Sequence, residues 1–479
     1  MVAEALAGQG RQIRAGLCAL ALVAADALPG LAIVRGGVAP AEQGAIAAQL
    51  AAGTGWREAT LDLSRLGSSP TFLWRGREQL FGWAYQSATI APGLADLNEA
   101  LEQGRPAYLA DRLDWWGIDD VVLDRPDPDL AGALAAHGFA PRGDAGQLRH
   151  WGRVGGPRAI LLDHPALGIG QGARVWAARF PQVVHGESDR IDDYTLNQLR
   201  RFDRVVLSRP QWRDRGAAEA LIRAYADAGG QVVIDLTGAP DDPFARTPRF
   251  LGVYGERLPF AGAGQTLDDL SGDRDVPRQL LPFDPQPWSA LVYAGLDQVT
   301  VATTYADESA AVAGRVAVGA GQITFIGLNL PYHLLLTGDP VAADLLARQT
   351  GLMPDRGVVG GSVPLEGYRA DGSGYRFTLT LDWDGRVVLP IARQDRMTVT
   401  VDGQTTRVTP LDDTVTLELP AGRHAIAIAV APGGNKPLGL VVTALGIVAS
   451  GLLLRRRPSA GVADTPVALP DRRDEAAVA

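Results

Sequence analysis

The chain has 479 residues, 46% of them hydrophobic, with 32 prolines and a net charge of −9. These proportions are typical of a folded, loop-rich protein with room for two or three domains. The acidic balance excludes nucleic acid as a partner, because neutralising phosphates needs a basic face. The only cysteine, Cys18, lies in an apolar stretch near the N-terminus. The folded part therefore holds no disulfide, thiolate metal site or catalytic cysteine.

Residues 13–35 contain an apolar stretch, Ala15 to Val34, that follows Arg11 and Arg14. We predict that it is a transmembrane helix or signal anchor, which leaves residues 1–12 as a cytoplasmic tail. Asp26 interrupts the segment. A cleaved secretory signal and a buried soluble helix are the alternatives.

Residues 36–155 are predicted to form a small α/β domain. Stretches with helical spacing alternate there with short runs that are apolar or alternate between apolar and polar residues. Helices are expected at 41–52, 108–116 and 129–137, and strands at 58–63 and 120–124.

Residues 156–352 have the pattern of a parallel sheet covered by helices on both faces, since continuous apolar strands alternate with helical stretches. The expected strands are 159–162, 182–184, 204–207 and 231–234, the expected helices are 173–179, 195–202 and 216–228, and a hairpin is expected over 310–327. Gly229 and Gly230 supply the exit from the helix that precedes the fourth strand.

The pattern changes to period two over residues 363–432, with Asp-Gly turns at 384 and 402. Several short strands joined by such turns predict a small antiparallel β-sandwich. The expected strands are 376–381, 387–390, 397–401, 415–419 and 424–429.

A second apolar segment, residues 437–454, carries no charge and is followed by Arg455, Arg456 and Arg457. We predict a transmembrane helix with residues 455–479 as a disordered cytoplasmic tail. Both flanks then lie in the cytoplasm. The folded part is expected to be extracytoplasmic, tethered to the plasma membrane, with the lipid bilayer as a partner.

The strings YADAGGQVVID, residues 225–235, and GRVAVGAGQITFIGLNL, residues 314–330, resemble the class I glutamine-amidotransferase-like fold. They are most similar to its degenerate versions in exported and membrane-associated bacterial proteins. Active members carry a cysteine on a tight elbow after a strand, whereas here the strand at 204–207 runs into Ser208-Arg209-Pro210. The resemblance implies the fold and not the chemistry. The expected fold class is thus α/β plus β: a small α/β unit, a parallel-sheet, flavodoxin-like domain and an antiparallel sandwich between two transmembrane helices.

A wider resemblance rests on LVAADALPGL, residues 22–31, on YLADRLDWWGIDDVVLD, residues 108–124, and on the sandwich strands. These resemble the extracytoplasmic C-terminal region of bacterial YfhO-like, glycosyltransferase-type membrane proteins and of their relatives labelled 6-pyruvoyl-tetrahydropterin synthase-related. In that family the catalytic carboxylates belong to a many-helix N-terminal module that this sequence lacks. The resemblance implies work beside cell-envelope glycan or lipid-linked sugar assembly. The implied partner is a polytopic membrane glycosyltransferase or an envelope glycan.

One polar cluster follows the expected strand at 182–184, at the edge where open α/β sheets bind ligands. Its carboxylates and imidazole have the chemistry to hold a hard cation. The alternative is that Asp192 or Asp193 caps the helix from Thr195 while the others are solvated. The loops at 164–172, 185–193, 208–215 and 237–244 are expected to converge at this edge, which suits a hydroxyl-rich sugar. The candidate ligand-binding residues are His185, Glu187, Asp192, Asp193, Asp235 and Asp241.

Signatures of catalysis are missing from the sequence. There is no G-x-S-x-G elbow, and the glycines at 168–172 match neither a dinucleotide-binding nor a Walker loop, which leaves a weak anion nest. We therefore expect no catalytic residue, no metal and no cofactor. The sequence favours a non-catalytic, membrane-anchored binding or scaffold protein. The alternatives are the C-terminal part of a split or truncated glycosyltransferase-type protein, and an exported hydrolase or metal-dependent enzyme that uses residues 185–193.

Overall fold

The computed structural model is strand-rich. It describes residues 40–53, 55–61, 78–81, 100, 104–123, 127–237, 249–260, 267–270, 288–305, 308–371, 374–394 and 396–431. Strands hold 45% of these residues and helices 25%, so the expected α/β fold class is wrong in its balance. None of the described helices is long and apolar enough to cross a membrane. The predicted spans, 13–35 and 437–454, and both predicted tails lie outside the described residues.

The N-terminal unit is a small mixed sheet with three helices packed against it. Its strands are β1 (Arg57–Leu61), β2 (Glu78–Phe81), β3 (Asp120–Leu123), β4 (Ala140–Ala145) and β5 (Leu148–Gly152), in the order β2-β1-β3-β5-β4. Its helices are α2 (Pro40–Ala52), α5 (Pro106–Trp115) and α6 (Pro128–Ala136). Proline begins each helix, where a missing N–H costs nothing, and the Asp127 carboxylate caps α6 by accepting from two backbone N–H groups. The predicted helices and strands of this unit are confirmed.

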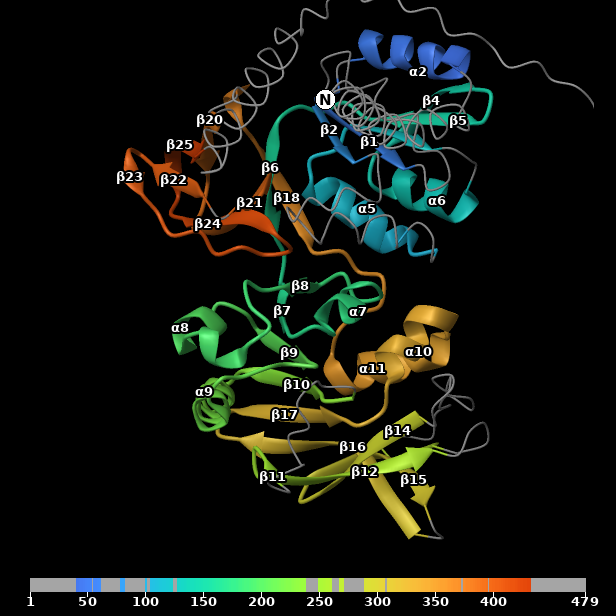
Figure 1. Ribbon diagram of the computed structural model, residues 1–479, viewed down its shortest axis with the longest axis vertical. Coiled ribbons are helices and arrows are strands. Elements are labelled where there is room, and N and C mark those ends of the chain that lie inside the picture. The colour runs from blue at the N-terminus through green and yellow to red at the C-terminus, as the bar shows by residue number, and fades with distance from the viewer. Residues whose placement is uncertain are drawn as a thin grey trace, which may run out of the picture. The chain divides into compact units, whose positions relative to one another are not determined.

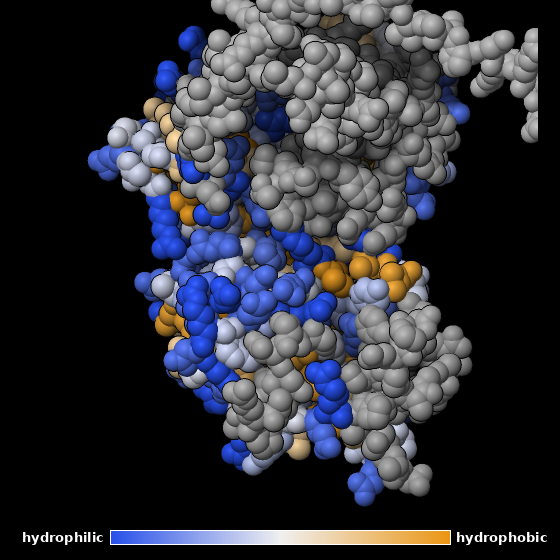
Figure 2. All heavy atoms as spheres, in the orientation of Figure 1, coloured by the Kyte–Doolittle hydropathy of each residue, from blue (hydrophilic) through white to orange (hydrophobic). Residues whose placement is uncertain are grey.

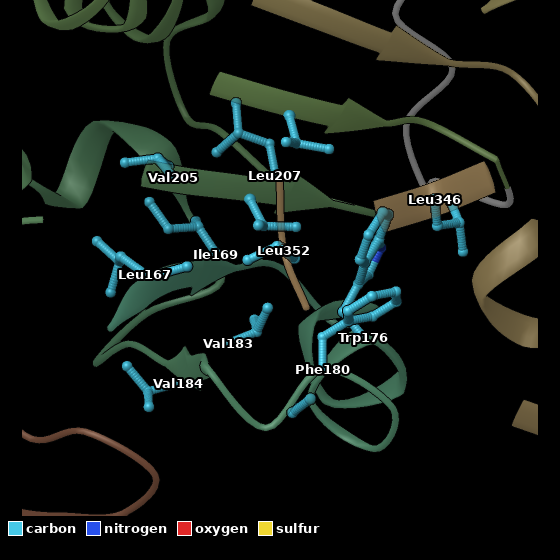
Figure 3. Packing of buried hydrophobic residues seen from close by; sticks show 14 of the residues in the cluster. Leu167, Ile169, Trp176, Phe180, Val183, Val184, Val205, Leu207, Leu346 and Leu352 are labelled. Carbon is cyan, nitrogen blue, oxygen red and sulfur yellow. The ribbon is translucent and has the colours of Figure 1, made fainter. Parts of the chain in front are cut away.

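An eleven-stranded sheet follows, and one half of it is parallel. Its parallel strands are β8 (Val183–His185), β7 (Ala166–Ile169), β9 (Arg204–Ser208), β10 (Gln231–Asp235) and β17 (Gly321–Ile326), in that order. The helices are α7 (Ala173–Ala177), α8 (Leu196–Leu199), α9 (Arg215–Asp227), α10 (Leu330–Thr337) and α11 (Pro340–Thr350). They flank the strands, with α8 and α9 on one side and α7, α10 and α11 on the other (Figure 1). Trp176 of α7 and Phe180 lie beside Ile169 and Leu207 of the strands (Figure 3).

The other half of this sheet is antiparallel, whereas the sequence predicted only parallel strands apart from the hairpin over 310–327. Its strands are β11 (Arg249–Phe250), β12 (Val253–Phe260), β13 (Leu267–Asp269), β14 (Trp288–Ala294), β15 (Gln298–Tyr305) and β16 (Glu308–Val318). The hairpin predicted over 310–327 is confirmed as β16 and β17, with Gly319 at a φ of 56° in the turn. Parallel pairing needs a long crossover, usually a helix. The described residues between β10 and β16 hold no helix, and the strands there pair antiparallel.

The predicted sandwich is present, and it takes one strand from far upstream. One sheet has the order β18 (Val359–Pro364), β6 (Arg158–Leu162), β21 (Gly385–Ala392), β24 (Thr414–Leu419). The other has the order β19 (Glu366–Asp371), β20 (Gly374–Leu381), β25 (Gly422–Val430), β22 (Met397–Val401), β23 (Gln404–Thr405). The interpretation of 159–162 as the first parallel strand was wrong, because β6 pairs antiparallel with β18 and β21.

Strand β6 has the continuous apolar sequence that is typical of a parallel strand, because both of its faces are buried. Ala159 and Leu161 pack in the sandwich core, whereas Ile160 and Leu162 pack in the larger core of the rest of the chain. A run buried on both faces is apolar throughout, whatever the direction of its neighbours. Helix α5 covers this outer face, where Trp115 Nε1 donates to Thr414 Oγ1 over 3.1 Å.

A buried ionic cluster joins the N-terminal unit, the parallel sheet and the sandwich. The Arg112 guanidinium, 2% exposed, lies 2.5 Å from Asp111 Oδ2 and 2.8 Å from Asp412 Oδ2. Asp412 Oδ1 accepts from the backbone N–H of His185, and the Asp412 N–H donates to the His185 carbonyl, each over 2.8 Å. Asp412 thus fixes the loop before β24 to the end of β8.

Candidate functional site

The sequence-predicted site residues do not form one cluster. His185 Nε2 lies 3.1 Å from Asp189 Oδ1. Asp193 accepts from Ser188 Oγ over 2.6 Å and pairs with Arg213 over 2.7 Å. Among the described residues no group of three or more His, Cys, Asp or Glu side chains is arranged to hold a metal ion. Asp241 lies outside the described residues.

Asp192 does not cap the helix from Thr195; it binds the chain just before another helix, α9, whose own N-cap is Asp214. The Asp192 carboxylate accepts from the backbone N–H groups of Arg213 and Asp214, which lead into α9. Burial acts to raise the pKa of Asp192, but these two N–H donors outweigh it and hold the pKa below its usual value. Thr195 caps α8 itself, in a reciprocal capping box with Gln198.

Asp235 lies in the core at the end of β10. Its carboxyl accepts from Ser208 Oγ over 3.0 Å, from Trp176 Nε1 over 3.4 Å and from the Thr237 N–H over 3.0 Å. Burial raises the pKa of Asp235. With its oxygens engaged and 3% of its surface exposed, Asp235 ties β9, β10 and α7 together.

The crevice expected at the carboxyl ends of β7 and β9 is filled by backbone. The Gly172 N–H donates to the Ser208 carbonyl over 3.0 Å. A Cβ on Gly170, at a φ of 104°, would lie 2.3 Å from the same oxygen. Glycine is required here so that two loops can touch, which accounts for the glycines at 168–172 without a bound anion.

A pocket lies instead between the α8 region and the outer face of the β21–β24 sheet. It holds about 390 Å³ of empty space, part of it open to solvent, and the surface around α8 is largely hydrophilic (Figure 2). Its lining residues are Leu167, Gly186, Glu187, Tyr194, Gln198, Arg201, Phe202, Arg386, Thr409, Pro410, Leu411, Thr416 and Glu418. Of the residues predicted from the sequence, Glu187 alone is in this set.

The first wall of the pocket is built on Gly186 and Tyr194. The Tyr194 hydroxyl donates to the Ser188 carbonyl and accepts from the Ser188 N–H, each over 2.9 Å. A Cβ on Gly186 would lie 2.2 Å from this hydroxyl, so only glycine leaves room for the phenol. Glu187 Oε1 then accepts from Gln198 Nε2 over 3.2 Å and from Arg407 Nη2 over 3.3 Å.

The second wall comes from the polar face of β21 and β24. Arg386 and Glu418 are cross-strand neighbours. Arg386 donates to the Arg201 carbonyl over 2.9 Å, and its guanidinium lies 4.1 Å from the centre of the Phe202 ring. Glu418 Oε2 lies 3.0 Å from Arg201 Nη1, and Glu418 Oε1 lies 3.5 Å from Arg386 Nη2.

One lining hydroxyl is buried without a partner. Thr416 is 2% exposed, and within the described part of the chain its Oγ1 has no hydrogen-bond partner. Native structures leave few such groups, because burying an unpaired hydroxyl is unfavourable. Thr416 is also one of the residues that line the pocket.

The missed residues carried a weak signal in the sequence. Strand β24 alternates, with Val415 and Leu417 directed to the sandwich core and Thr416 and Glu418 on the other face. The alternation of apolar and polar residues along this strand predicts that polar face. Nothing in the sequence indicated that it meets α8.

Comparisons with known proteins give two domain matches and no established activity. Residues 166–333 match a domain of unknown function, DUF8560, and residues 42–126 match another, DUF8559. No curated protein matches the sequence. Each family match covers less than half of the chain.

Among solved structures, similar chains include three β-galactosidases. That of Rahnella sp. R3 is 13% identical over 57% of this chain and 42% of its own, with a TM-score of 0.24. That of Bacillus circulans sp. alkalophilus is 10% identical over 57% and 42%, with a TM-score of 0.25. That of the Antarctic haloarchaeon Halorubrum lacusprofundi is 14% identical over 57% and 40%, with a TM-score of 0.25. The chain spans less than half the length of these enzymes, and its function is argued below from its own residues.

Proposed function

We propose that the protein binds a sugar unit of a cell-envelope glycan in this pocket and does not react with it. The lining combines an apolar part, Leu167, Phe202 and Leu411, with carboxylates and guanidinium groups. A pyranose ring has the same division, with C–H groups on its faces and hydroxyls at its edge. Sites that bury an apolar surface and orient it with a few polar groups are the usual form of small-ligand pockets.

The observation that carries this proposal is the buried Thr416 hydroxyl. An unsatisfied buried hydroxyl costs about 1–3 kcal/mol. A ligand hydroxyl that enters the pocket would donate to Thr416 Oγ1 or accept from it, and would recover that cost on binding. An apolar ligand would leave the cost in place.

The absence of turnover follows from what the pocket offers. The carboxylates that glycosidases use as acid and nucleophile have two counterparts in the lining, Glu187 and Glu418. Glu187 and Glu418 are each engaged by arginine side chains. The polytopic glycosyltransferase partner that the sequence resemblance implies stays a prediction.

Ligand-observed NMR with glucose and galactose tests the proposal, with Thr416→Val as the decisive variant. Valine keeps the shape and removes the unpaired hydroxyl. We expect sugar binding to weaken about five-fold, from the loss of one hydrogen bond worth about 1 kcal/mol, while the melting temperature stays level or rises. Thr380→Val, at an exposed position of β20, is the matched control. Unchanged affinity in Thr416→Val, or a parent protein that binds no sugar of any class, refutes the proposal.

A further inference from the structure

The charges around the pocket do not balance. Three guanidinium groups, those of Arg201, Arg386 and Arg407, lie at its walls and rim, against the carboxylates of Glu187 and Glu418. Arg407 is 71% exposed, so solvent screens its pair with Glu187. The guanidinium group that would attract an anionic ligand most strongly is therefore the most deeply buried one.

That charge is Arg386. Its side chain is 13% exposed, against 42% for Arg201. Its Nη2 lies 3.5 Å from Glu418 Oε1, whereas the other oxygen of Glu418 lies at 3.0 Å from Arg201. Arg386 therefore shares its counter-ion Glu418 with a closer competitor, and Asp203, which also attracts Arg386, is 76% exposed and screened by solvent.

The pKa of Arg386 shows that Glu418 compensates its charge only in part. Burial lowers the pKa of Arg386 and outweighs the attraction of Glu418, which acts to raise it. The carbonyl of Arg201 and the ring of Phe202 fix the position of the guanidinium but supply no full negative charge. A cation desolvated in this way gains from an anion that arrives with its ligand.

We propose that the ligand of this pocket is an acidic sugar, whose carboxylate binds Arg386 while a hydroxyl bonds Thr416. This inference rests on the proposed sugar-binding function and names the class of sugar. Arg386 and Thr416 are on adjacent strands of one sheet face: Arg386 is opposite Glu418, and Val388 is opposite Thr416. A uronic acid carries a carboxylate and hydroxyls on one ring, so a single monosaccharide unit presents both groups. The planar fork of arginine suits a carboxylate better than a hydroxyl.

Calorimetric titration with two sugar pairs tests the inference on the full chain. Glucuronate is compared with glucose and galacturonate with galactose, with acetate as a plain anion. We expect the better uronate to bind at least about ten-fold more tightly than its neutral sugar, as a hydrogen bond between charged groups allows. Raising the salt concentration should narrow that gap.

Variants separate a binding role from a structural one. Arg386→Gln should bring the uronate down to the affinity of the neutral sugar and leave the neutral sugar unchanged. Glu418→Gln removes the competing carboxylate and should tighten uronate binding several-fold, an effect that damage to the fold would not produce. Arg376→Gln, at an exposed position of β20, should change neither.

The outcomes are distinct for the two proposals. Equal affinity for uronates and neutral sugars, or acetate binding as tightly as a uronate, overturns the acidic-sugar inference and leaves sugar binding or a plain anion site. Failure of all four sugars to bind overturns the proposed function itself. Tightening in Glu418→Gln together with loss in Arg386→Gln supports both.

Discussion

Asp412 is the residue whose removal should most disturb the wall of the pocket without touching its lining. It pairs with the buried Arg112 guanidinium, and it exchanges two backbone hydrogen bonds with His185. Its backbone has a φ of 43°, a left-handed conformation that Asn tolerates and Ala does not favour. Asp412→Asn therefore removes only the charge, whereas Asp412→Ala also removes the acceptor and strains the backbone.

The magnitudes follow from burial. Arg112 and Asp412 are 2% and 8% exposed, and removing one partner of a buried ion pair costs about 3–5 kcal/mol. We expect that range for Asp412→Ala. Asp412→Asn should cost roughly half as much, because Arg112 keeps Asp111 and His185 keeps its acceptor. Asp163 pairs with Arg356 at the surface, both 45% exposed, so Asp163→Asn should cost under about 1 kcal/mol.

Equilibrium unfolding in urea measures these differences, with tryptophan fluorescence as the signal. Trp115 and Trp176 are fully buried, so both report on the packing that Asp412 holds. The m-value should stay constant, since the exposed surface is the same. If Asp412→Asn and Asp163→Asn shift the midpoint equally, the cluster is not the joint that we infer.

Three further predictions concern pH and two glycines. The hydrogen bond that the His137 ring donates to the Asp114 carboxylate raises the pKa of His137 above its usual value of about 6.5. The stabilisation from this pair is full below about pH 6.5 and is lost as the pH rises through the raised pKa of His137. The melting temperature should therefore fall from pH 6 to pH 8, and His137→Gln should flatten that slope; an unchanged slope would contradict the assignment. Gly186→Ala should cost about 1–3 kcal/mol by forcing the Tyr194 hydroxyl aside. Gly132→Ala, in α6 with nothing within 4 Å, should stabilise by about 0.5–1 kcal/mol in the same thermal melts.

The local sequence pattern was enough to predict elements that pack or pair with neighbours close by in the sequence. Helix α9 has the predicted span, and Gly229, at a φ of 101°, ends it before β10 as expected. The predicted turn at Gly319 likewise fixes the register of β16 and β17. Such features depend on backbone conformation and periodicity, which are encoded residue by residue.

The sequence pattern did not show which strands pair with one another. The apolar run 159–162 indicates burial on both faces, and this is correct, but the same run fits a parallel and an antiparallel neighbour. Most residues of the pocket were missed for a related reason. Glu187 was found because it follows a strand end, whereas Arg386 and Thr416 come from a sheet that the sequence does not connect with α8.

The pairing of β6 with β18 has a consequence for how the chain is made. Leu162 is opposite Val359, so residues 163–358 are inserted between two strands of one antiparallel pair. At the usual 5–20 residues per second, the ribosome needs about 10–40 s to make that insertion. During this interval β6 has been synthesised and its neighbours on both edges have not, which leaves an apolar strand open to wrong pairing. Rapid folding of the inserted sheet would bring the two ends together and shorten the search of β6 for its partner. Variants that slow this sheet should therefore aggregate during synthesis before they lose stability in the finished protein.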